Sequence, residues 1–125
     1  MKTSAKVVVI GGGVVGCSVL YHLTKMGWTD IMLIERSELT SGSTWHAAGG
    51  FHTLNADTNM AALQGYTIRL YRELEEITGM SCGLHHVGGV TLAGTQDRLD
   101  YLIAERAKHR YMGLDTQIIG PEEIK

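Results

Sequence analysis

Three glycines near the start of the chain have the spacing of a phosphate-binding turn. Gly11, Gly13 and Gly16 form the pattern G-x-G-x-x-G directly after an apolar run. In this pattern the first glycine allows a tight turn, the second lets the backbone approach a pyrophosphate, and the third lets helix and strand pack closely. The N–H groups of the turn that begins with Val14 and Val15 then face the anion. The spacing predicts a dinucleotide-binding site.

An acidic residue stands where such a site needs one. Glu35 follows the second apolar run and lies 19 residues after Gly16, which suits a carboxylate that binds the ribose hydroxyl groups. A carboxylate would repel the 2′-phosphate of NADP, although the neighbouring Arg36 weakens that argument. NAD and FAD both contain an adenosine ribose and a pyrophosphate, so these residues leave the two cofactors unresolved.

A second candidate for function is the loop that follows. The stretch LTSGSTWHAAGG, residues 39–50, has no apolar period and places a tryptophan and a histidine among small residues. These residues belong to a longer stretch of low periodicity that runs from after Glu35 to about Thr58. Loops of that length inside a compact domain are usually functional, so we expect a role beyond connecting two elements.

Apolar periodicity predicts the elements that must position these residues. Continuous β-branched runs are typical of buried parallel strands, and apolar residues three or four apart are typical of helices. The predicted strands are 6–10, 31–34, 87–92 and 116–119, and the predicted helices are 14–26, 59–78 and 96–112. Pro121 and the acids after it open a further helix. The first strand, helix and strand form a βαβ unit.

The predicted fold class is therefore α/β, with a Rossmann-type βαβ unit followed by the start of a further α+β portion. We expect residues 1–58 to hold the dinucleotide-binding unit and the adjoining loop, and residues 59–125 to begin a substrate or cap portion. A parallel unit of two strands has little sheet to bury, and the last helix is incomplete at Lys125. The chain is thus expected to be an incomplete part of a larger, two-domain protein that needs a further C-terminal portion or a companion subunit.

Composition narrows the setting. Hydrophobic residues make up 44% and charged residues 19% of the 125, and the net charge is −2, so there is no basic field for nucleic acid or acidic lipid. No apolar run has the length of a membrane span. Cys17 and Cys82 form no CxxC pair and the histidines have no zinc spacing, so we expect free thiols, no metal site and a cytoplasmic location.

The sequence resembles a known family over nearly all of its length. The stretch IERSELTSGSTWHAAGG is similar to the dimethylglycine and sarcosine dehydrogenase group of FAD-dependent amine oxidoreductases, within the D-amino-acid oxidase fold family. The resemblance continues through LYRELEEITG, VGGVTLAGTQDRLDYL and GPEEI. The glycine pattern is shared by very many flavoproteins, whereas the Ser43–Gly49 segment is far more specific.

The resemblance implies FAD as the cofactor. It also implies a covalent bond from His46, because the matching histidine of several members is joined to the 8α-methyl carbon of the flavin. Imidazole is a competent nucleophile near neutral pH, and the small residues Ala47 and Gly49 allow a close approach. The alternatives are a non-covalent contact between His46 and the flavin, and a histidine that only donates to a backbone carbonyl.

The rest of the loop would then follow the extended cofactor from its pyrophosphate to its ring. Ser41, Ser43 and Thr44 carry hydroxyl groups that can bind phosphate or ribitol oxygens. Trp45 either packs against the flavin ring or fills the interior of the loop.

Family chemistry implies the oxidation of an N-methyl or secondary amine by hydride transfer to the flavin. The alternatives are a non-catalytic FAD-binding protein, because the group also resembles a regulatory subunit of pyruvate dehydrogenase phosphatase, and a plain NAD-binding Rossmann module. The Trp-His loop argues against the last. The residues assign no catalytic group, and they leave the amine, the electron acceptor and the oligomeric state open.

Overall fold

The computed structural model describes residues 3–124. The chain forms two compact units, Met1–Gly49 and Gly50–Lys125. This structural boundary lies within the predicted first domain, 1–58. The functional division into a cofactor-binding portion and a substrate portion stays a prediction.

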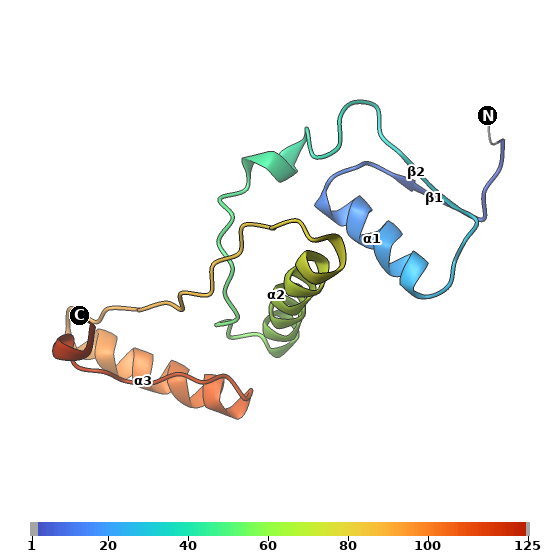
Figure 1. The fold of residues 1–125 in the computed structure, drawn as a ribbon. Helices are drawn as coiled ribbons and strands as arrows, with labels where there is room; N and C mark the ends of the chain where they lie inside the picture. The colour runs from blue at the N-terminus through green and yellow to red at the C-terminus, as the bar shows by residue number, and fades with distance from the viewer. Residues whose placement is uncertain (1–2, 125) are drawn as a thin grey trace. The chain divides into compact units, whose positions relative to one another are not determined.

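The first unit is the predicted βαβ unit. Strand β1 (Val7–Ile10), helix α1 (Val14–Lys25) and strand β2 (Ile31–Ile34) follow one another, and the two strands pair in parallel with Val7 opposite Ile31 and Ile10 opposite Ile34. Helix α1 packs along both strands (Figure 1). Gly27, at φ +85°, ends the helix by donating its N–H to the carbonyl of Thr24.

The prediction that both strands are buried is wrong for this chain. Along β1, Val7 and Val9 are half-buried, while Val8 and Ile10 are 45% and 85% exposed. Successive side chains of a strand point to opposite faces. A Cβ at Gly16 of α1 would lie 3.4 Å from Val9 Cγ1, so the helix packs on the face with the half-buried positions. Within the described residues of the first unit, α1 is the helix that packs on this sheet.

The second unit contains two helices, α2 (Thr58–Thr78) and α3 (Gln96–Tyr111), close to the predicted ranges. Both begin at side-chain caps, since Asp57 accepts the N–H of Met60 at 2.8 Å and Thr95 accepts that of Arg98 at 3.2 Å. Gly79, at φ +68°, ends α2.

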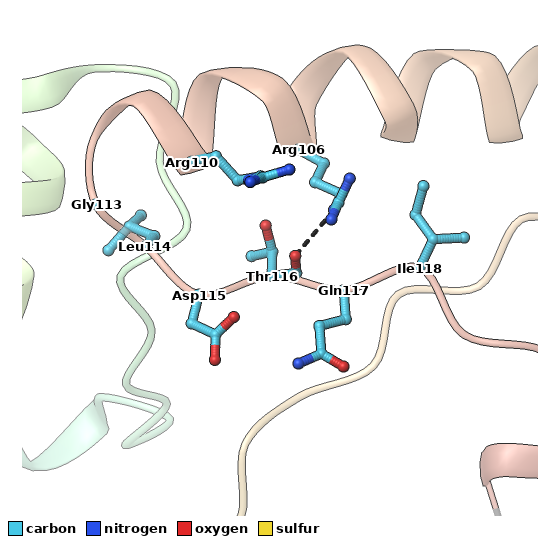
Figure 2. Close-up of a pocket in the computed structure, with 8 residues that line it drawn as sticks. All are labelled: Arg106, Arg110, Gly113, Leu114, Asp115, Thr116, Gln117 and Ile118. Atoms are coloured by element: carbon cyan, nitrogen blue, oxygen red, sulfur yellow. Dashed lines mark hydrogen bonds between the residues drawn. The ribbon is translucent and has the colours of Figure 1, made fainter.

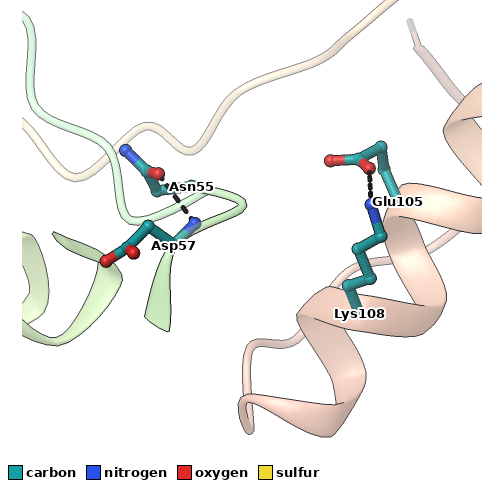
Figure 3. A network of polar contacts seen from close by, with 4 residues as sticks. All are labelled: Asn55, Asp57, Glu105 and Lys108. Atoms are coloured by element: carbon teal, nitrogen blue, oxygen red, sulfur yellow. Dashed lines mark hydrogen bonds and ion pairs between the residues drawn. The ribbon is translucent and has the colours of Figure 1, made fainter. Parts of the chain in front are cut away.

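Short-range polar contacts support these helices (Figure 3). The side chain of Asn55 accepts the N–H of Asp57 at 3.0 Å and orders the residue that caps α2. On α3, Lys108 and Glu105 form an exposed ion pair of 2.6 Å. Solvent screens such a surface pair, so it adds little to the stability of the helix.

The predicted strands at 87–92 and 116–119 are wrong, because the described residues form a single sheet of β1 and β2. A strand needs a neighbouring strand for its N–H and C=O groups, and neither segment has one here. The predicted last helix is a short 3₁₀ turn, η2 (Pro121–Ile124).

Few apolar side chains are buried. Among the described residues only Ala61 of α2 forms a buried hydrophobic core position, at 6% exposure, whereas Leu63 and Ile77 of the same helix are 58% and 65% exposed. The apolar positions of α2 are therefore left largely uncovered by residues 3–124. No described helix is both long enough and apolar enough to cross a membrane.

Candidate cofactor-binding site

The turn from β1 into α1 has the geometry that the glycine pattern predicts. Gly11 adopts φ +104°, a conformation that side chains disfavour, and donates its N–H to the carbonyl of Ile34 at 2.8 Å. A Cβ atom at Gly16 would overlap the carbonyl oxygen of Gly11 and lie 3.4 Å from Val9 Cγ1. The first and last glycines therefore have the turning and packing roles expected of them.

The middle glycine keeps the start of α1 open. Gly13 is the N-cap residue, and it has no side chain with which to cap the helix. A Cβ there would lie 3.0 Å from the hydroxyl oxygen of Thr44. The first N–H groups of a helix lack intrahelical partners and carry the positive end of its dipole. The first turn of α1, which includes Val14 and Val15, thus fits the pyrophosphate of a dinucleotide.

Glu35 lies against this turn rather than at a distance from it. One carboxylate oxygen accepts the N–H of Gly12 at 2.7 Å, and the other accepts that of Ser37 at 2.9 Å. The Gly12 bond is the main cause of a pKa below the ordinary carboxyl value, so Glu35 is ionised at neutral pH. A carboxylate has about four acceptor positions, so it keeps capacity for ribose hydroxyl groups.

The loop containing the Trp-His pair is connected to the same turn. Residues Ser43–His46 form a 3₁₀ turn, η1, and within it the Thr44 hydroxyl accepts the N–H of Val14 at 2.9 Å. Thr40 donates its own N–H to the carbonyl of Gly12 at 2.9 Å. Two hydrogen bonds therefore hold the loop beside the start of α1, although 30 residues separate Val14 from Thr44.

Trp45 and His46 lie against each other. Their ring centroids are 3.9 Å apart with the planes tilted by 36°. The indole Nε1–H donates to the carbonyl of Ser41 at 3.1 Å, and His46 Nδ1 lies 3.1 Å from the carbonyl oxygen of Gly42. Both side chains are exposed, and the indole contacts the imidazole.

The remaining predicted site residues are at the surface. Arg36 lies beside Glu35, and its positive charge contributes to the lowered pKa of that carboxyl group. The side chains of Ser41 and Ser43 are exposed, as are Ala47 and Gly49.

Two residues important to this geometry were not predicted. Gly12 is buried, and a Cβ there would lie 2.5 Å from Leu39 Cδ2 and 3.2 Å from Glu35 Cβ. The run of three consecutive glycines was the available signal, because the motif treats Gly12 as a free position. Thr40 adopts φ +67°, unusual for a β-branched residue, and no sequence signal indicates it.

A shallow polar pocket lies in the second unit (Figure 2). Arg106 donates to the carbonyl of Thr116 at 2.9 Å, and Arg110 lines the same pocket. None of the residues predicted to bind FAD lines it. Among the described residues, no three His, Cys, Asp or Glu side chains gather as metal ligands would.

Known proteins are similar to the chain over almost all of its length. It is 42% identical to rat (Rattus norvegicus) mitochondrial dimethylglycine dehydrogenase over 98% of the chain, and 40% identical to human (Homo sapiens) mitochondrial sarcosine dehydrogenase over all of it. It is also 39% identical, over 99% of the chain, to the mouse (Mus musculus) mitochondrial regulatory subunit of pyruvate dehydrogenase phosphatase. In each case the chain spans 14% of the relative's length.

A solved structure and a family model agree with these relatives. The crystal structure of L-proline dehydrogenase from P. horikoshii superposes with a TM-score of 0.87 at 25% identity, covering 99% of this chain and 32% of that one. The model of the FAD-dependent oxidoreductase family (DAO) matches residues 6–125. The chain has a Rossmann turn with an adjacent carboxylate, and it is related to amine dehydrogenases. Because the family model also matches almost the whole chain, the chain belongs to the DAO family of FAD-dependent oxidoreductases.

Proposed function

We propose that this chain is the FAD-binding N-terminal part of an enzyme that oxidises an N-methyl or secondary amine of the sarcosine or dimethylglycine type. The observation that supports the proposal is that Glu35 and Thr44 both contact the glycine turn at Gly12–Val14. The chain that contains this turn is about 40% identical to dimethylglycine and sarcosine dehydrogenases. Bound FAD supplies the acceptor for a hydride that leaves the carbon next to the amine nitrogen.

The residues of this chain bind and orient the cofactor. The N–H groups of the first turn of α1, apart from that of Val14, which Thr44 accepts, receive the pyrophosphate, because they are the positive end of a helix whose N-cap residue, Gly13, has no side chain. Glu35 accepts hydrogen bonds from the ribose hydroxyl groups. Residues that select the amine are expected in the polypeptide that the relatives have beyond the matched 14%.

His46 is the residue proposed to join the flavin covalently. The carbonyl oxygen of Gly42 can only accept a hydrogen bond, so in the neutral imidazole this contact favours the proton on Nδ1 and leaves a lone pair on Nε2. Such an attachment would replace one C–H bond of the 8α-methyl group by a C–N bond to Nε2 of His46. It would release one proton from the methyl carbon and one from the imidazole, and FAD, when bound, would supply the two-electron acceptor that balances the bond.

The test is the mass of the full chain after denaturation. Wild-type protein is expected to carry one FAD on the peptide that contains His46. His46→Ala is expected to bind FAD reversibly and to release it in acid, because Glu35 and the α1 turn remain intact. His52→Ala, which changes another exposed histidine, serves as the control. A wild-type peptide without added mass, in protein that binds FAD, would reduce His46 to a contact residue.

A second function is favoured by the 39% identity to the phosphatase regulatory subunit. A non-catalytic relative would bind FAD without using it. Anaerobic mixing of the complete polypeptide with sarcosine or dimethylglycine separates the two functions. An enzyme loses its flavin absorbance as the cofactor is reduced, whereas a regulatory protein keeps it. The cytoplasmic location stays a prediction, and the names of several relatives place those proteins in mitochondria.

A further inference from the structure

The indole of Trp45 has an unusual environment for so large an apolar group. It is 66% exposed, so it contributes little to the interior of the first unit. Its ring lies instead 3.9 Å, between centroids, from the imidazole of His46. Neighbouring residues in extended backbone point their side chains to opposite faces, whereas the 3₁₀ turn Ser43–His46 brings these two rings together.

Both rings are fixed to the backbone in the same way. Trp45 donates through Nε1 to the carbonyl four residues before it, that of Ser41, and His46 contacts through Nδ1 the carbonyl four residues before it, that of Gly42. The backbone N–H of Trp45 also donates to the carbonyl of Thr40 at 3.3 Å. The indole is therefore a fixed surface against which the imidazole rests.

This arrangement selects one nitrogen of the imidazole. An unrestrained neutral imidazole exchanges its proton between Nδ1 and Nε2, and an exposed side chain rotates among several rotamers. Contact with the indole face restricts rotation of His46, and the Gly42 carbonyl then holds the proton on Nδ1. The lone pair of Nε2 is consequently free for a carbon electrophile.

We infer that Trp45 is a positioning residue for His46: it holds the imidazole with Nδ1 on the Gly42 carbonyl and presents Nε2 as the nucleophile for flavin attachment. The inference rests on the covalent link of the proposed function. It assigns the indole to the imidazole and not to the flavin ring. Phenylalanine at position 45 keeps an aromatic face, whereas leucine removes it.

The first measurement needs no cofactor. Apoprotein of the full chain with ¹⁵N-labelled histidine reports by NMR which nitrogen of His46 carries the proton, with the signal assigned by its absence in His46→Ala. Wild type and Trp45→Phe are expected to show a protonated Nδ1 and an unprotonated Nε2. Trp45→Leu is expected to show the averaged signals of two exchanging tautomers. Trp28→Leu removes the other indole of the same unit and should match wild type.

The second measurement is the rate at which FAD becomes attached to the His46 peptide after its addition to apoprotein, followed by mass spectrometry. Loss of an aromatic contact should slow attachment about three- to tenfold in Trp45→Leu, with little change in Trp45→Phe or Trp28→Leu. Reversible FAD affinity, measured in the His46→Ala background, should stay the same in Trp45→Leu. A lower affinity there would instead place the indole on the flavin and overturn the inference.

The two proposals fail in different ways. If Trp45→Leu keeps the wild-type tautomer and the wild-type attachment rate, the positioning role is wrong while the covalent link stands. If wild type binds FAD without an added mass, the covalent link is wrong, and the tautomer spectra still decide whether Trp45 orients His46.

Discussion

The hydroxyl oxygen of Thr44 accepts the backbone N–H of Val14 at 2.9 Å, and so joins the Trp-His loop to the first turn of α1. Thr44 is half-buried, and the position that a Cβ of Gly13 would take is 3.0 Å from the same oxygen. The hydrogen of this hydroxyl group remains available for a phosphate oxygen. One side chain therefore connects the predicted pyrophosphate site with the segment that holds His46.

Thr44→Val should weaken FAD binding about two- to tenfold, because valine keeps the shape of threonine and removes one neutral hydrogen bond. Titration with FAD in the His46→Ala background, where binding is reversible, measures the effect. Thr44→Ser restores the hydroxyl group and should recover most of the affinity. Equal affinity of the valine and threonine proteins would show that the Val14 contact does not support the site.

Gly16→Ala should abolish FAD binding and destabilise the βαβ unit, since the added methyl group would overlap the carbonyl oxygen of Gly11. FAD content and circular dichroism of the purified variant report the two effects. Gly89→Ala is the matched control, because a Cβ there meets no atom within 4 Å. Full FAD occupancy in Gly16→Ala would contradict the close packing of α1 on the turn.

Gly13→Val should also prevent FAD binding, but for a different reason. Its Cβ would lie 3.0 Å from Thr44 Oγ1, and the branched side chain would fill the space at the helix start that the pyrophosphate needs. We expect α1 still to form, because Gly13 lies outside the helix at φ −78°, an extended backbone conformation that any residue can adopt. Flavin absorbance after purification, compared with helix content, distinguishes this variant from Gly16→Ala.

Glu35→Gln should lower FAD affinity about ten- to hundredfold, because hydrogen bonds from a ribose to a carboxylate are stronger than those to an amide. In the variant, the amide oxygen of the glutamine must also accept the N–H of Gly12 that the carboxylate accepts in the wild type. Titration in the His46→Ala background provides the dissociation constant, and Glu38→Gln, three residues further on, is the control. An unchanged FAD dissociation constant would mean that Glu35 binds the backbone of the turn and not the ribose.

Acidification should destabilise the first unit through Glu35. Its pKa lies below the ordinary value of 4.5, chiefly because the carboxylate accepts the N–H of Gly12. A carboxyl group with a lowered pKa stabilises the folded chain above its unfolded pKa, and this contribution is lost as the pH falls through the folded pKa. The urea midpoint of the apoprotein should therefore drop from about pH 5 downward, less steeply in Glu35→Gln. If the urea midpoints of wild type and Glu35→Gln fall equally with pH, the loss of stability in acid does not come from Glu35.

The local elements of this protein follow from its sequence. The apolar runs at 7–10 and 31–34, the caps Asp57 and Thr95, and the terminating Gly27 and Gly79 each depend on residues within a few positions of one another. Helix hydrogen bonds close over four residues, so a helix can be predicted from its own segment. The βαβ order, the glycine turn and the family resemblance could likewise be predicted, because each depends on short segments of the sequence.

Contacts between distant segments could not be predicted in this way. Val14 meets Thr44, and Gly12 meets Glu35, only after β2 has paired with β1 and brought residues 35–46 back to the start of α1. The same reasoning explains the wrong strands at 87–92 and 116–119, which have suitable residues and no pairing partner within residues 3–124.

The sequence by itself determined that a G-x-G-x-x-G turn, an acidic residue and a Trp-His loop would occur in this order. Only the tertiary structure decided that Glu35 and Thr44 hydrogen-bond to that turn and that Trp45 lies on His46. The physical reason is that residue type sets which bonds a side chain can make, while the partner is set by whichever segment the folded backbone brings within hydrogen-bonding distance.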